Sequence, residues 1–178
     1  MVISELPVIR PEPANQGLMY PHSVPFDSQL VEARLALGMI GPDEMPALAW
    51  DALEAGHDGP STRRLAALIK PSGWETDQII PAFMAEAGMQ SISRQEASIR
   101  VAMQLARRIL REGLDPLAYS RDFEDLWIRA DYPTAIQEVG SLDDQKAVAE
   151  YMGQSEAELR EYARSVLLAL AATREPKL

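Results

Sequence analysis

From residue 27 onward the sequence repeats one pattern, in which apolar residues at helical spacing are followed by a glycine or a proline. Apolar residues three and four positions apart form one face of an α-helix, whereas a half-buried strand alternates apolar and polar residues. No segment sustains that alternation. We therefore predict an all-α fold, an irregular orthogonal bundle of about 8–9 short to medium helices.

Helix-capping residues locate the strongest of these helices. Ser93 with Glu96, and Ser155 with Glu158, form the Ser-x-x-Glu pattern that satisfies free N–H groups at a helix start. They predict one helix ending at Gly113 and a long final helix. The remaining patterns predict helices over residues 27–40, 43–55, 60–70, 72–88, 115–130, 133–140 and 142–152.

Residues 1–26 differ from the rest of the chain. Prolines recur in this segment, and they remove backbone donors and favour extended backbone. The segment is also too apolar for a simple disordered tail, so we expect it to lie across the helical body or across a partner. We predict a Pro-rich extended arm at 1–26 and a single helical domain at 27–178.

The charge balance excludes some partners. The chain has 27 acidic and 17 basic residues, a net charge of −10. Binding to the nucleic-acid backbone or to an anionic membrane needs a positive contact face, so we expect neither partner. We expect another protein as the partner and leave homo-oligomerisation open.

The absence of cysteine excludes disulfides, thiolate metal sites and cysteine nucleophiles. The first residues lack the pattern of a signal peptide, and no run of about 18 apolar residues suggests a membrane span. We expect a cytoplasmic protein. The 14 arginines against 3 lysines suggest a bacterial source with a GC-rich genome.

One cluster has a spacing that metal sites use. Asp51, Glu54, His57 and Asp58 fall near the end of a predicted helix, and Glu-x-x-His occurs in di-iron bundles. A second copy of that motif is missing, and a cationic His57 also suits a helix C-terminus. An enzyme or metal protein using residues 51–58 stays an alternative, but we predict no catalytic residue, cofactor or metal.

Residues 47–69 resemble the helix-turn-helix of DNA-binding regulators. Gly56 would make the turn, and the second helix would begin with residues that contact DNA: Ser61, Thr62, Arg63 and Arg64. The pattern departs from that family at His57 and Thr62, where apolar residues are usual. A DNA-binding regulator using residues 43–70 is the alternative that this resemblance implies, against a plain antiparallel helix pair.

The helix predicted after Ser93 has the only concentrated positive face in the sequence. Residues 94–111 have a net charge of +4, and Arg100, Arg107 and Arg111 are spaced to share one side. This side would bind an acidic partner protein or an acidic segment of the same chain, such as residues 122–125.

Trp74 follows the loop at residues 71–73, where an aromatic residue either anchors the loop or contacts a partner. The preceding predicted helix, over 60–70, is expected to bury Leu65, Leu68 and Ile69. With no catalytic motif in the sequence, the leading hypothesis is a non-enzymatic helical interaction module that acts through an acidic surface. Regulatory, adaptor and toxin-neutralising proteins belong to this class.

Overall fold

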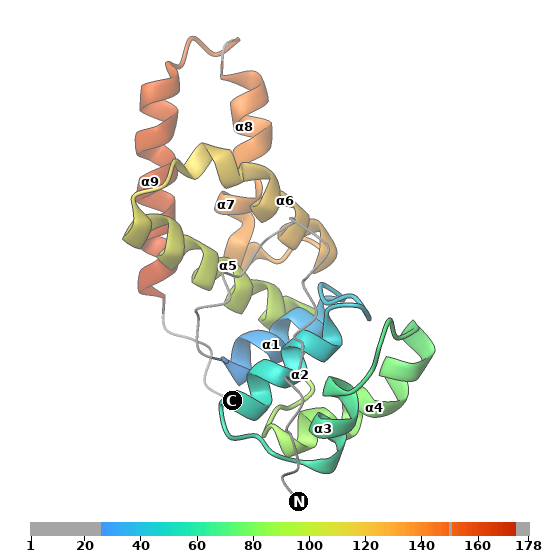
Figure 1. The fold of residues 1–178 in the computed structure, drawn as a ribbon. Coiled ribbons are helices and arrows are strands. Elements are labelled where there is room, and N and C mark those ends of the chain that lie inside the picture. Colours follow the sequence, from blue (N-terminus) through green and yellow to red (C-terminus); the bar gives the residue numbers. More distant parts are fainter. Residues whose placement is uncertain (1–25, 150, 174–178) are drawn as a thin grey trace, which may run out of the picture. The chain divides into compact units, whose positions relative to one another are not determined.

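The computed structural model describes residues 26–149 and 151–173. These residues form helices α1 to α9 and the 3-10 helices η1 and η2, with no strand among them (Figure 1). The all-α prediction is confirmed. Apart from residue 26, the predicted arm lies outside the described residues. None of the described helices is long and apolar enough to cross a membrane.

The described residues divide into two compact units. Residues 26–28 and 40–90 belong to unit 1, and residues 29–39, 91–149 and 151–173 belong to unit 2. The chain therefore contributes α1 (Ser28–Ala36) almost entirely to unit 2 before it builds unit 1. The single domain over 27–178 stays a prediction.

Unit 1 consists of α2 (Met45–Glu54), α3 (Pro60–Ala66) and α4 (Gly73–Glu86). The short helix α3 packs against both α2 and α4. Pro81 lies inside α4. The core of this unit is mostly aliphatic and includes Met45, Ala49, Ala52, Leu65, Ile79 and Phe83.

Glu86, at the end of α4, fixes the start of α3. Its carboxylate accepts hydrogen bonds from the Ser61 amide at 2.9 Å, the Thr62 amide at 2.8 Å and the Thr62 hydroxyl at 3.0 Å. Gly59 leaves room for this carboxylate, because a Cβ there would collide with it. Burial raises the pKa of Glu86, but the hydrogen bonds from Ser61 and Thr62 outweigh burial and lower the pKa overall.

Unit 2 is organised by α5 (Arg94–Glu112), its longest helix, which packs along α9 (Glu156–Ala172) and against α6 (Ser120–Arg129). The helix starts at Ser93, whose hydroxyl accepts from the Glu96 amide at 3.1 Å. It ends at Gly113 in the left-handed conformation, with φ 65°, as the sequence predicted. Buried residues from these helices include Met103, Ile109, Phe123, Leu126, Leu159 and Leu167.

Shorter elements complete unit 2: η1 (Pro116–Tyr119), η2 (Thr134–Ile136), α7 (Gln137–Gly140) and α8 (Leu142–Val148). The single helices predicted over 115–130 and 133–140 each begin instead with a 3-10 turn. At η1, the Asp115 side chain accepts from the Leu117 amide at 3.1 Å, and Pro116 supplies no N–H. A short 3-10 turn therefore precedes α6, and another precedes α7.

Gly140 allows α7 to lie directly against α6. A Cβ on Gly140 would fall 2.5 Å from Cγ of Trp127, far inside van der Waals contact. The ring of Tyr132 meets Trp127 edge-on, with ring centroids 5.0 Å apart. The Trp127 side chain therefore sets the position of the segment from Tyr132 to Gly140.

Replacing Gly140 by alanine is expected to destabilise the protein by about 1–3 kcal/mol, because α7 or Trp127 must move. Chemical unfolding followed by circular dichroism measures this change. The matched control is Gly73→Ala in the first turn of α4, where a Cβ meets nothing within 4 Å. Equal stability of the two variants would contradict the close contact with Trp127.

Glu86→Gln is expected to cost about 1 kcal/mol at neutral pH, because the amide accepts these hydrogen bonds less well than a carboxylate. Since the folded pKa of Glu86 is lowered, its contribution is complete above the unfolded pKa of about 4.3 and is lost as the pH falls through the folded value. The stabilities of wild type and variant should therefore converge in acid. Asp77→Asn, an exposed carboxylate on the same helix, is the control in denaturant titrations across this pH range.

Candidate functional site

The turn between α3 and α4 exposes two large apolar side chains. Ile69 is 89% exposed and Trp74 is 74% exposed. The prediction that Ile69 is buried was wrong, because α3 ends at Ala66 and the chain turns, with Lys70 in the left-handed conformation at φ 49°. Without a continuing helix, the helical period no longer directs residue 69 towards the core.

The turn that carries these side chains is held in place by hydrogen bonds. Ser72 and Glu75 form a capping box, in which the Glu75 carboxylate accepts from the Ser72 amide at 2.8 Å and the Ser72 hydroxyl accepts from the Glu75 amide at 3.3 Å. The hydrogen bonds that the Ser72 amide and hydroxyl donate to the Glu75 carboxylate lower the pKa of Glu75. Trp74, between them in sequence, is therefore presented on an ordered helix start. We call Ile69 and Trp74 the turn patch.

Three of the four residues predicted to contact DNA have partners inside unit 1. Thr62 is fully buried and bonded to Glu86, and the Ser61 amide donates to the same carboxylate. Arg63 makes a bidentate pair with Asp58, at 2.5 and 2.6 Å. Hydrogen bonding to Arg63 lowers the pKa of Asp58. Arg64 is exposed. The negative charge of the Glu86 carboxylate at the start of α3 would repel a DNA phosphate at this position.

The Asp51 to Asp58 cluster does not converge on one point. His57 contacts the Phe26 ring, with centroids 5.2 Å apart, and Asp58 pairs with Arg63. Among the described residues, no three histidine, aspartate or glutamate side chains lie in an arrangement that holds a metal ion.

Arg100 faces the interior of unit 2. Its guanidinium donates to Glu32 of α1 and to Glu96, one turn earlier on α5, both at 2.7 Å. The side chain of Arg100 is 9% exposed and that of Glu32 is 6% exposed. The positive charge therefore neutralises carboxylates of the same unit and is not presented to a partner.

The other two arginines of the predicted basic side lie in different surroundings. Arg107 is half-buried and donates to the carbonyl of Ala171, near the end of α9, at 3.4 Å. Arg111 is exposed, with Glu112 at 3.6 Å. Residues 122–125 were one candidate acidic segment for this side, but the carboxylates paired with Arg100 are those of Glu32 and Glu96. Burial and then the charge of Asp125 raise the pKa of Asp122. Trp74 belongs to unit 1 and the three arginines to unit 2.

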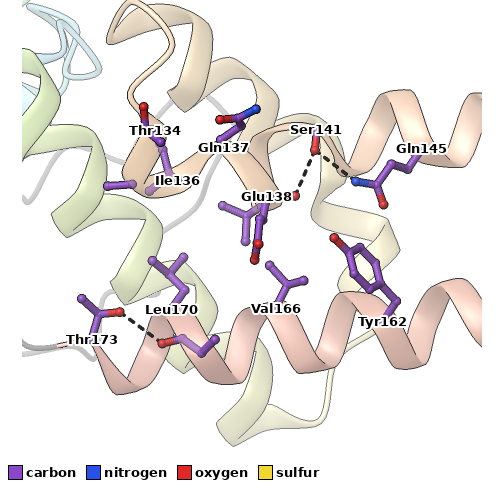
Figure 2. Close-up of a pocket in the computed structure, with 13 residues that line it drawn as sticks. Thr134, Ile136, Gln137, Glu138, Ser141, Gln145, Tyr162, Val166, Leu170 and Thr173 are labelled. Carbon is purple, nitrogen blue, oxygen red and sulfur yellow. Dashed lines mark hydrogen bonds between the residues drawn. The ribbon is translucent and has the colours of Figure 1, made fainter.

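A groove of about 450 Å³ lies between α9 and the segment formed by η2 and α7. Figure 2 shows Tyr162, Val166 and Leu170 of α9 on one side and Ile136, Glu138 and Ser141 on the other. Ser141 donates to the Glu138 carbonyl at 3.2 Å and accepts from the Gln145 side chain at 3.1 Å. The groove thus has an aliphatic floor and a polar rim.

The wall of this groove follows a strained turn. Asp131 and Tyr132, immediately before Pro133, have φ values of 60° and 57°, which side chains other than glycine seldom adopt. Such strain persists where the surrounding structure enforces it. Here the contacts of Trp127 with Tyr132 and Gly140 do so.

The sequence did not reveal this groove. Tyr162, Val166 and Leu170 follow one another at helical spacing on the final helix, but Tyr162 is exposed and belongs to the groove. The signal that the sequence offers is an apolar stripe on this helix that is too wide for one neighbouring helix to cover. The opposite wall comes from two short elements whose positions the sequence pattern does not specify.

Comparison of the chain with protein-family models, with curated proteins and with solved structures finds no match. The function of each candidate site is therefore inferred from the geometry of that site.

Arg100→Met is expected to destabilise the protein by about 3–5 kcal/mol, because it leaves Glu32 and Glu96 without their buried counter-charge. Arg111→Met, on the same helix, should change stability by less than about 0.5 kcal/mol, since Arg111 is exposed. Unfolding midpoints in urea measure both. Similar midpoints for the two variants would show that the ion pairs of Arg100 do not support the fold.

Proposed function

We propose that the protein is a non-enzymatic helical interaction module that binds another protein through the turn patch. Regulatory, adaptor and toxin-neutralising proteins are the classes that this proposal covers. A cytoplasmic location in a bacterium, expected from the sequence, is part of it.

The exposure of Ile69 and Trp74 is the observation that carries the proposal. Leaving an aromatic and an aliphatic side chain in water forgoes the stabilisation that burial gives, about 1.5–3 kcal/mol for each. Tryptophan is enriched among the residues that contribute most to protein–protein binding. Trp74 lies at the capped start of α4, where the backbone is already ordered, so less entropy is lost on binding.

The charge of the chain supports a protein partner with a basic contact region. A net charge of −10 accelerates encounter with positively charged surfaces and slows encounter with anionic ones. The apolar turn patch would then supply affinity, while the acidic surface would supply rate and selectivity.

The contacts inside unit 1 favour this proposal over DNA binding. Glu86 occupies the amides at the start of α3, and Asp58 neutralises Arg63. These are the groups that would have met the phosphates. The proposal includes no catalytic step.

The test compares partners captured by the full-length protein with those captured by an Ile69→Ser, Trp74→Ala variant. Extracts of the organism that encodes the chain are used, with and without nuclease, followed by quantitative mass spectrometry. We expect a nuclease-resistant protein partner whose affinity falls about tenfold or more in the variant. The thermal midpoint should change little, because both side chains are exposed.

The matched control is Leu168→Ser, Tyr151→Ala, which removes an exposed aliphatic and an exposed aromatic residue from unit 2. Partner binding that falls equally in both double variants would reflect a general loss of surface hydrophobicity and contradict the turn patch. Capture of nucleic acid alone, lost on nuclease treatment, would contradict a protein partner.

A further inference from the structure

We propose that two copies of this chain associate through the exposed face of α4, with the two helices antiparallel and related by a two-fold axis. This face consists of five exposed residues, which we call the α4 strip: Trp74, Gln78, Pro81, Ala82 and Ala85. The inference goes beyond the proposed function. It shares Trp74 with the turn patch, so one Trp74 side chain serves either a second copy or another partner.

The α4 strip lies opposite the side of α4 that is buried in unit 1. At 3.6 residues per turn, its members fall within an arc of about 100° on the helix. Thr76, Ile79 and Phe83 form the buried side, and α3 packs against α4 within unit 1. The strip is therefore a helix face that unit 1 leaves exposed.

The side chains of the α4 strip carry no charge. The chain has a net charge of −10, so two copies repel each other wherever their charged faces meet. The acidic residues of α4 lie beside the strip: Glu75 is held in the capping box, Glu86 bonds to the start of α3, and Asp77 is exposed. A second copy can therefore contact this face without burying a carboxylate.

The shape of the α4 strip is self-complementary when two such helices run antiparallel. Trp74 lies at one end and Ala85 at the other, about 16 Å apart along the helix at 1.5 Å per residue. In a pair centred between residues 79 and 80, each Trp74 covers Ala85 of the other copy, and each Gln78 faces Pro81. A large side chain meets a small one at both ends, which allows close packing in an isologous contact.

Pro81 adds a polar group to the strip. Proline has no N–H, so the carbonyl of Asp77, four positions earlier, receives no helical hydrogen bond from it. Asp77 and Pro81 are both exposed, which places this carbonyl at the strip. The carboxamide of Gln78 from the second copy, opposite Pro81, would donate a hydrogen bond to this carbonyl.

The size of the α4 strip indicates a weak dimer. A tryptophan buries about 150–250 Å², and the short strip adds only small side chains, so each copy supplies less than the roughly 800 Å² of a standard stable interface. We expect a dissociation constant of about 100 μM. Such a dimer would cover Trp74 when no tighter partner is bound.

The first test is sedimentation equilibrium of the full-length protein from about 10 μM to about 1 mM. We expect a monomer–dimer equilibrium that Ala85→Glu weakens about tenfold or more, because it places a carboxylate beneath Trp74 of the other copy. The control is Ala55→Glu, which adds the same charge at an exposed position after α2 in the same unit. Circular dichroism checks that both variants keep the fold.

Ionic strength provides a second readout. Raising NaCl from about 50 to about 500 mM screens the repulsion between two acidic copies, so it should strengthen the dimer about two- to fivefold. Binding of a basic partner at the turn patch should instead weaken as salt rises. The two contacts therefore respond to salt in opposite directions.

Cross-linking locates the contact, because the chain contains no cysteine of its own. In the antiparallel pair the two copies of Gln78 lie about 4.5 Å apart along the helix axis, at 1.5 Å per residue. Gln78→Cys should therefore form a disulfide between two copies under mild oxidation. Ala55→Cys, the control, should do so at least about tenfold more slowly.

Four results would overturn the proposal: a monomer at about 1 mM, association beyond a dimer, equal weakening by the two glutamate variants, or equal cross-linking at residues 55 and 78. Ile69→Ser should keep the dimer and weaken partner binding. Ala85→Glu should weaken the dimer and keep partner binding. Failure of the dimer and failure of the turn patch are therefore separately measurable.

Discussion

The buried guanidinium of Arg100 connects two segments of unit 2 that are far apart in sequence. It bonds to Glu32 of α1 and to Glu96 of its own helix, and all three groups are largely removed from water. A charge in such surroundings requires close partners, because the cost of removing it from water is large. The pairing holds α1 on α5, although the chain leaves α1 to build unit 1 before α5 begins.

The two candidate surfaces arise from opposite physical situations. At the turn patch a helix ends early, and the side chains that follow it remain in water although a capping box orders the backbone. At the groove, core residues are fixed by packing, but the wall above them is made of short elements that leave the space beside α9 open. The apolar side chains of the turn patch are exposed, whereas the aliphatic side chains that line the groove are buried.

The sequence pattern predicted the type and position of the helices well, but it predicted their ends less well. The Ser-x-x-Glu patterns located the starts of α5 and α9, because capping satisfies local backbone groups. The end of α3 was missed, so Ile69 was assigned to the core. The basic side of α5 was visible as spacing, but the partner of Arg100 came from α1, a contact across 68 positions that no local pattern encodes.

The sequence by itself determined the all-α class, the main helices and the net negative charge, because periodicity, capping and composition act over a few neighbouring residues. The tertiary structure decided which side chains are paired, exposed or arranged around a groove. Trp127 against Gly140, Glu86 at the start of α3, and Arg100 with Glu32 each join different helices. Such contacts form only when whole helices pack together. Their free energies depend on both packed surfaces, so the sequence of either segment alone does not determine them.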